Sequence, residues 1–308
     1  MATADSTVTT TSTQALPSRR LRVTPTQIVA FVILALLSVS WLVPFLWMLS
    51  TSLKTPQELV GNSFFPQNPT GEAYYTAFFA FDRWPNWVRW TFNTATITLI
   101  AVVGKVLSTA FVAYSFARLR WPGRDLMFSL VLATMMIPGV VIMIPQFILF
   151  SKLPAFGFQG SQTWVNTFLP LTVPAFTGDA FFIFLMRQQM RGIPMELSEA
   201  ARIDGAGELR IWWNIIVPLV KPVMGVIAIF TFQAAWEDFM GPLLYLQREE
   251  KYTLQLGLRQ FEAAAGGLPA WNELMAASLV VMIPTILVFL MFQKYFIEGV
   301  QISGSLKG

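Results

Sequence analysis

Cysteine and histidine are both missing from this sequence of 308 residues. Without cysteine the chain has neither a disulfide framework nor a thiolate metal site, and nothing indicates its redox compartment. The missing histidine removes the commonest metal ligand, the commonest general base and the usual proton-relay group. We therefore expect a protein that is not an enzyme and binds no cofactor of its own.

Charged residues are also scarce, since Asp, Glu, Lys and Arg make up 12% of the chain while 55% is hydrophobic. In a soluble domain roughly a quarter of the residues are charged. Apolar runs of about 20 residues cross a bilayer as helices. The sequence therefore predicts an all-α membrane protein with six transmembrane helices, at about 27–52, 92–117, 125–150, 163–186, 211–240 and 273–297.

The basic residues predict the orientation of these helices. With the N-terminus in the cytoplasm, the larger share of the 21 Lys and Arg residues falls on the cytoplasmic side, as the positive-inside bias requires. Both termini are therefore expected in the cytoplasm. The positive-inside bias then accounts for the net charge of +4, because the excess of basic residues lies on the cytoplasmic side. No nucleic-acid partner is expected.

The N-terminal residues 1–26 are predicted to form a disordered cytoplasmic tail ahead of a transmembrane domain at 27–308. Residues 1–18 are rich in Thr and Ser and offer nothing to offset the entropy of ordering them. A secretory signal is the alternative. The apolar run is too long for one, however, and no small-x-small cleavage site follows it.

Aromatic residues and prolines mark further features of the spans. Trp84, Trp87 and Trp90 end the longest predicted outer segment, residues 53–91, and Trp is typical of the membrane boundary. The alternative is that these three tryptophans form a surface that binds a ligand. Pro138 in the third span removes a helical hydrogen bond, and Pro170 does so in the fourth. The freed carbonyls must face a neighbouring helix or a water-filled cavity.

A polar stretch between the fourth and fifth spans is the most unusual part of the sequence. EAARIDGAGELRIWWNIIVP, residues 199–218, carries five charges in its first twelve residues. Pro194 suits the first turn of a helix, and Gly205 supplies a stop with positive φ. A second helix is expected to begin near Glu208. The pattern predicts a helix, a glycine turn and a second helix across the cytoplasmic end of the bundle.

The first of these helices has two interpretations. Ala200 and Ala201 let another surface approach closely, while Glu199, Arg202 and Asp204 can make charged hydrogen bonds at its edge. These features favour docking of another protein. An amphipathic loop helix that rests on lipid headgroups is the alternative.

The same stretch resembles the EAA loop of the membrane subunits of ABC importers. The matching pattern is Glu199-Ala200-Ala201, three residues, Gly205, nine residues, Ile215, one residue and Val217-Pro218, where the family normally has Leu at the Val217 position. MMIPGVVIMIP (135–145), FFIFLMRQQMRGIPMELSEAARIDGAGELRIWW (181–213), WEDF (236–239) and the C-terminal FIEGVQISGSLKG are similar to the maltose-type, MalG-like carbohydrate permeases. The resemblance covers roughly residues 27–308.

This resemblance implies a type I ABC importer permease fold with a coupling helix that docks on an ATP-binding subunit. The coupling loop would cover about 192–210, with Glu199 and Gly205 as the central docking residues and Ala200, Ala201, Arg202 and Asp204 around them. The chain itself has no GxxxxGK[ST] motif, and its one Gly-Lys pair, Gly104-Lys105, lacks the upstream glycine. ATP and Mg are therefore expected in two separate ATP-binding subunits.

Further partners follow from the same resemblance. A second permease subunit, an F-type paralogue, would complete the pathway, and an extracytoplasmic solute-binding protein would deliver the substrate. The loop between the fifth and sixth spans would probe that protein with Gly266, Gly267, Leu268 and Pro269. A plain surface turn is the alternative for this loop.

Polar residues within the spans suggest a pathway for a sugar. Asp179, Gln233, Trp236 and Asp238 combine carboxylates and an amide with an aromatic face, which suits hydroxyl groups and an apolar sugar ring. The alternative for Asp179 is a structural ion pair with Lys105, because charge inside a membrane usually finds a partner.

The sequence thus predicts the permease subunit of an ATP-driven, binding-protein-dependent carbohydrate importer in a prokaryotic cytoplasmic membrane. An ion-coupled secondary transporter of a polar solute is the alternative, although it would need paired intramembrane carboxylates and no docking loop. A membrane-embedded enzyme is disfavoured, because the chain has no histidine, no cysteine and no clustered carboxylate motif.

Overall fold

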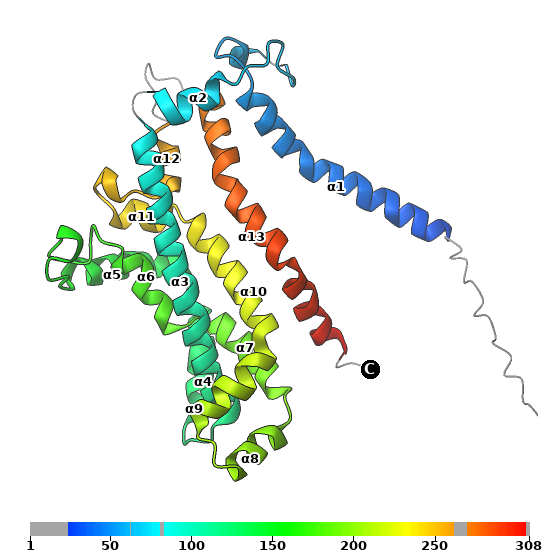
Figure 1. Ribbon diagram of the computed structural model, residues 1–308, viewed down its shortest axis with the longest axis vertical. Coiled ribbons are helices and arrows are strands. Elements are labelled where there is room, and N and C mark those ends of the chain that lie inside the picture. The colour runs from blue at the N-terminus through cyan, green and yellow to red at the C-terminus, as the bar shows by residue number, and fades with distance from the viewer. Residues whose placement is uncertain (1–23, 62, 81–82, 262–269, 306–308) are drawn as a thin grey trace, which may run out of the picture. The chain divides into compact units, whose positions relative to one another are not determined.

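The computed structural model describes residues 24–61, 63–80, 83–261 and 270–305, with side chains as far as Lys294. The chain divides into two compact units, Met1–Trp47 and Met48–Gly308. The regular structure of the described residues is helical throughout, with one isolated β-bridge between Pro154 and Thr163 (Figure 1). This confirms the predicted all-α class.

The described residues of the first unit, 24–47, belong almost entirely to α1, Pro25–Ser52, whose last residues fall in the second unit. The helix has 28 residues and is apolar around its whole circumference, which is typical of a helix surrounded by lipid or by other helices. Its length is sufficient to cross a bilayer. A helix of spanning length thus lies at the predicted span, 27–52.

Three long helices organise the second unit: α3, Trp84–Arg118; α10, Val217–Trp236; and α13, Trp271–Ser305 (Figure 1). Both α3 and α13 pack against α10. Helices of spanning length and apolar composition cover the predicted spans at 92–117, 211–240 and 273–297, and α3 already begins at Trp84. Pro85 lies in the first turn of α3, where its missing N–H costs no hydrogen bond.

Shorter elements complete the second unit. They are η1, Glu58–Val60; α2, Glu72–Phe79; α4, Arg124–Thr134; α5, Gly139–Lys152; η3, Phe158–Gly160; α6, Leu169–Thr172; η4, Val173–Thr177; α7, Ala180–Arg191; α11, Met240–Tyr245; η6, Glu249–Lys251; and α12, Leu254–Arg259. The elements α8, α9 and η5 link α7 to α10.

The third predicted span, 125–150, is not one straight helix. It is divided into α4 and α5, whose axes meet at 99°. Pro138 stands at the break in an extended conformation with ψ of 132°, because it cannot supply the N–H that would continue α4. The described residues contain five helices of spanning length and composition, or six if this bent pair counts as one span.

The fourth predicted span, 163–186, is interrupted as well. Its helix begins at Leu169 rather than 163, and Gly178 separates η4 from α7 with φ of +83°. Polar side chains of α3 satisfy carbonyls at this interruption: Ser108 Oγ donates to Ala175 O at 3.2 Å, and Lys105 Nζ donates to Gly178 O at 3.3 Å. The break therefore meets the requirement that backbone groups within a membrane find partners inside the protein.

Two of the three tryptophans expected at the membrane boundary are buried within the protein. Trp87 and Trp90 lie in an outer cluster, which also contains Trp236, Leu254 and Phe261. The indole N–H of Trp87 donates to Ala77 O, and that of Trp90 donates to Glu249 O, both at 2.9 Å. The expectation was wrong for this pair, because their polar atoms find partners in the fold instead of in the interface.

Gly257 in α12 offers a test of this packing. A Cβ at this position would lie 2.5 Å from Cζ3 of the buried Trp90 ring. We expect Gly257→Ala to lower the midpoint of thermal unfolding of the full chain in detergent by roughly 2–10 °C, since overpacking costs about 1–3 kcal/mol. Gly71→Ala is the matched control, because a Cβ there meets no atom within 4 Å. Equal midpoints for the two variants would contradict the close contact.

Candidate functional site

The helix, glycine turn and second helix predicted between the fourth and fifth spans are present. The first helix is α8, Met195–Ile203, preceded by Pro194 at its N-cap. Gly205 follows with φ of +80°, a conformation that glycine adopts without strain. The second helix, α9, covers Glu208–Ile211. Both helices lie at one end of the second unit, opposite α2 and α12 (Figure 1).

The surface of α8 combines charged, small and apolar side chains. Glu199, Ala200, Arg202, Asp204 and Gly205 are exposed, whereas Ala201 is half-buried against the core cluster. Large apolar side chains join this surface: Ile203 is 87% exposed, and Leu197 and Leu209 are also exposed. Exposed apolar groups rimmed by charge are typical of a protein-docking surface.

The C-terminal end of α3 holds the start of α8 in place. Arg118 is only 3% exposed, and its guanidinium donates to Ile193 O at 2.7 Å and to Pro194 O at 3.4 Å. It also contacts Met195 Sδ at 2.8 Å. In the sequence, Arg118 was only one of the basic residues of the cytoplasmic side. Its partners are distant backbone carbonyls, which leave no pattern in the sequence.

A second connection joins α3 to α9 and the end of α8. Tyr114 donates to Glu208 Oε2 at 2.5 Å, while Arg202 Nε donates to Glu208 Oε1 at 2.8 Å. The hydrogen bond that Arg202 donates to the Glu208 carboxylate raises the pKa of Arg202, so that its guanidinium remains charged. Arg202, predicted as a docking residue, therefore already uses part of its hydrogen-bonding capacity on Glu208 of its own chain.

The predicted coupling loop, about 192–210, continues into α10 through a π turn, η5, at Trp212–Ile216. Pro218 follows two residues later and has no N–H for the usual helical bond, which accounts for a wider turn here. Ile211, the residue before the turn, and Ile216, its last residue, are fully buried in a core cluster with Met186 and Met190 of α7. The loop is thus continuous with α10 and bonded to α3.

Each of the four predicted pathway residues has its own local environment in the structure. Asp179 caps α7, accepting from Phe181 N at 3.0 Å, and it makes no ion pair with Lys105. Asp238 accepts from Gly241 N at 3.0 Å at the start of α11. Gln233 is exposed on α10.

Trp236 is 5% exposed, and its indole N–H donates to Val281 O of α13 at 3.1 Å. It borders two cavities of about 310 and 370 Å³ between α3, α10 and α13, whose lining is apolar apart from Thr91 and Thr98. Neither cavity offers the several convergent polar groups that a sugar needs. Trp236 packs between helices here, and its role in a sugar pathway stays a prediction.

The residues predicted to probe a binding protein, Gly266, Gly267, Leu268 and Pro269, lie outside the described residues. The residues on either side of this segment are close together, since Ala270 N donates to Phe261 O at 3.2 Å. Arg83 lies over the Phe261 ring at 5.1 Å and forms an ion pair with Glu273 at 2.9 Å. The base of the segment is therefore firmly attached to the outer cluster.

Comparison with known proteins relates this geometry to transport systems. A family model described as "Binding-protein-dependent transport system inner membrane component" matches residues 106–302. The galactooligosaccharides transport system permease protein GanQ of Bacillus subtilis is 32% identical over 90% of this chain and 94% of its own length. The sn-glycerol-3-phosphate transport system permease protein UgpE of Yersinia enterocolitica is 32% identical over 68% of this chain and 70% of its own.

Solved structures show the same fold. A bacterial ABC transporter involved in the import of the acidic polysaccharide alginate superposes with a TM-score of 0.73 and 25% identity, over 87% of this chain and 95% of the other. The bacterial alginate ABC transporter in complex with an alginate pentasaccharide-bound periplasmic protein gives 0.57 and 14% identity, over 86% and 93%. The predicted type I importer permease fold is confirmed.

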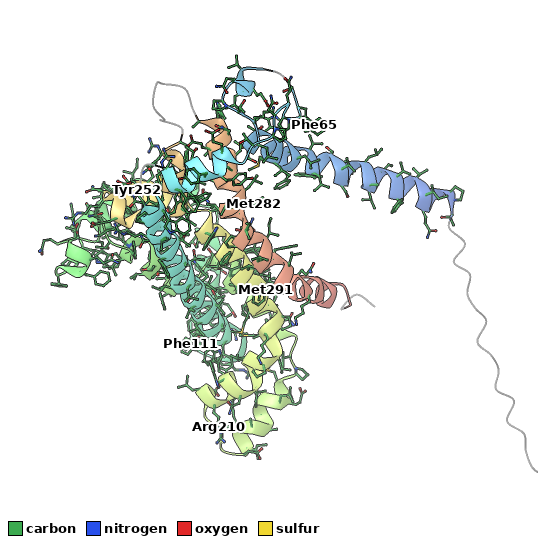
Figure 2. The ribbon with its side chains drawn as sticks, turned by 45° about the horizontal axis from the view of Figure 1, so that its top comes forward. Phe65, Phe111, Arg210, Tyr252, Met282 and Met291 are labelled. Atoms are coloured by element: carbon green, nitrogen blue, oxygen red, sulfur yellow. The ribbon has the colours of Figure 1, made fainter. Side chains whose placement is uncertain are left out.

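The role of Arg118 can be tested by hydrogen exchange. We expect Arg118→Met to leave two partly buried hydrogen bonds unmade and to cost about 2 kcal/mol locally, which corresponds to exchange about 30-fold faster for the α8 amides. The measurement is hydrogen–deuterium exchange on the full chain. Arg210→Met is the control, since Arg210 is exposed on α9 (Figure 2). Unchanged exchange in Arg118→Met would show that α8 does not depend on this anchor.

Proposed function

This chain belongs to the family of binding-protein-dependent transport system inner-membrane components, and from this membership we propose that it is the permease subunit of an ATP-driven importer. The surface of α8 supports this most directly. It is exposed, carries both charged and apolar groups, and is anchored to two long helices. Such a surface suits an ATP-binding subunit, with Glu199, Ala200 and Gly205 at the centre of the contact.

Energy for transport would come from outside this chain. The sequence contains no phosphate-binding GxxxxGK[ST] loop, so ATP and Mg would be bound by two separate subunits. Movement of those subunits would displace α8. Because α8 continues through α9 into α10 and is bonded to α3 by Arg118, the displacement would reach both helices together.

Helix α3 extends from the coupling loop to the outer cluster. α3 has 35 residues without an interior proline, which gives a length of about 52 Å. Arg118 stands at its cytoplasmic end, and Trp87 and Trp90 stand near the other. The outer cluster also holds Phe261, so α3 would connect the docking surface with the base of the segment proposed to meet a solute-binding protein.

The proposed assembly contains further partners. A related permease subunit would complete the pathway, and an extracytoplasmic solute-binding protein would deliver the substrate to residues 266–269. The solved neighbour with a bound periplasmic protein supports this arrangement. Both termini would lie in the cytoplasm, because the basic residues are concentrated on that side.

A carbohydrate is the proposed substrate class, since several relatives are named as oligosaccharide transport permeases. Gln233, Asp238 and Asp179 remain the proposed polar groups of the pathway. The two carboxylates are engaged by backbone amides in this structure, and a change of helix position could release them. The packing of Trp236 argues against direct sugar stacking on this residue.

Two glycines of the coupling loop provide a paired test of the docking proposal. Gly205 has φ of +80°, whereas Gly207 has φ of −74° at the N-cap of α9. We expect Gly205→Ser to strain the turn by about 1–2 kcal/mol and to reduce ATP-driven uptake and recovery of the ATP-binding subunit roughly tenfold. Gly207→Ser should leave both near the wild-type value, because Ser is a favoured N-cap residue.

Uptake would be measured in vesicles loaded with ATP, with and without an ion gradient, using the co-expressed partner subunits. Dependence on ATP alone supports the importer. Dependence on the gradient alone would instead identify an ion-coupled transporter. Equal uptake and equal subunit recovery for Gly205→Ser and wild type would refute docking at this turn.

A further inference from the structure

The loop between α3 and α4 carries two pockets that the proposed transport function does not use. A pocket of about 340 Å³ is lined by Arg120, Trp121, Gly123, Arg124, Asp125 and Leu126. A neighbouring pocket of about 530 Å³ shares Arg120 and Trp121 and extends to the coupling loop. Both lie where the apolar part of α3 ends, at the level expected for lipid headgroups.

Positive charge exceeds negative charge around the smaller pocket. Asp125 Oδ1 is 3.0 Å from Arg124 Nε and 4.0 Å from Arg187 NH2, so one carboxylate is shared by two guanidinium groups. Arg120 is exposed and makes no hydrogen bond or ion pair with any residue in the described part of the chain. The site therefore has unsatisfied capacity for an anion.

An apolar surface adjoins this charge. Leu126 lines the pocket and is 69% exposed, and Leu130 is exposed one turn further along the same face of α4. Met127 is exposed beside them. A ligand that placed an anionic group on Arg120 could therefore extend an apolar chain along α4. A free anion would leave the apolar face unused.

We propose that this pocket binds the phosphate of an anionic phospholipid, with Arg120 and Arg124 on the headgroup and the α4 face of Leu126 and Leu130 against an acyl chain. Arginine suits phosphate because its planar fork makes paired, charge-assisted hydrogen bonds. Basic pockets between membrane helices recognise lipid headgroups in this way. A carboxylate of a docked subunit would satisfy the arginines but not the adjoining apolar face.

The position of the site gives the lipid a route to the coupling loop. The larger pocket continues from Arg120 to Glu199 and Arg202, the residues of α8 proposed to meet an ATP-binding subunit. A bound headgroup would stand beside the docking surface without covering its exposed apolar residues. The lipid site itself requires no partner subunit, so it can be tested independently of the proposed transport.

The test uses the full chain, purified in a non-ionic detergent and stripped of lipid. Binding of short-chain phosphatidylglycerol is measured by titration calorimetry, with phosphatidylcholine of equal chain length, glycerol phosphate and inorganic phosphate as comparison ligands. We expect Arg120→Gln to weaken phosphatidylglycerol binding about fivefold and Arg120→Gln/Arg124→Gln about 25-fold. Arg210→Gln removes an exposed arginine of α9 outside both pockets and should change binding less than twofold.

Selective binding of phosphatidylglycerol that is lost in the double variant supports the site. Equal binding of phosphatidylcholine would overturn the requirement for an anionic headgroup, and equal binding of glycerol phosphate or inorganic phosphate would overturn the acyl-chain contact. Undiminished binding in the double variant would also overturn the proposal. If Arg120→Gln weakened only recovery of the ATP-binding subunit, the arginines would serve protein docking and the lipid site would be rejected. Leu126→Asn, which keeps every arginine, is a second variant expected to weaken lipid binding but not phosphate binding.

Discussion

Three backbone carbonyls, two at the interruption of the fourth span and one before α8, accept hydrogen bonds from side chains of a single helix, α3. Ser108 donates to Ala175 O, Lys105 to Gly178 O and Arg118 to Ile193 O. Inside a bilayer no water replaces such donors, so a break is stable only where a neighbour supplies them. The interrupted fourth span and the entry to α8 therefore both depend on α3 lying in this position.

This constraint explains why the bundle can contain irregular backbone and still be well packed. Gly104 lets the ring of Phe176 approach α3 closely, since a Cβ there would lie 2.7 Å from Cε2 of that ring. The fully buried Ala110 and Ala113 serve the same purpose nearer the coupling loop. Small residues on α3 thus permit contact, and its polar residues make the contact specific.

Much of this architecture was predictable because it follows from local composition. Long apolar runs identified the spans, and Gly205 between two helix-forming segments identified the turn. The 99° bend between α4 and α5 was not predictable, because Pro138 allows either a kinked helix or a full change of direction. Only neighbouring helices decide between these outcomes.

The site was predictable to a similar, partial extent. Residue type located the exposed surface of α8, since small and charged side chains are unusual beside apolar runs. It could not distinguish Trp87 and Trp90 inside the protein from tryptophans at a lipid boundary, because both environments suit an amphipathic ring. Arg118 was equally undetectable, as its partners are main-chain oxygens more than seventy positions away along the sequence.

The π turn at Trp212–Ile216 has a mechanical consequence. A π turn holds one residue more than the surrounding α-helix, so converting it to regular helix would rotate everything before it by about 100° relative to α10. Wide turns of this kind can shift along a helix by exchanging one hydrogen bond at a time. The junction could therefore convert a displacement of α8 into a rotation of α10 about its own axis, without bending either helix.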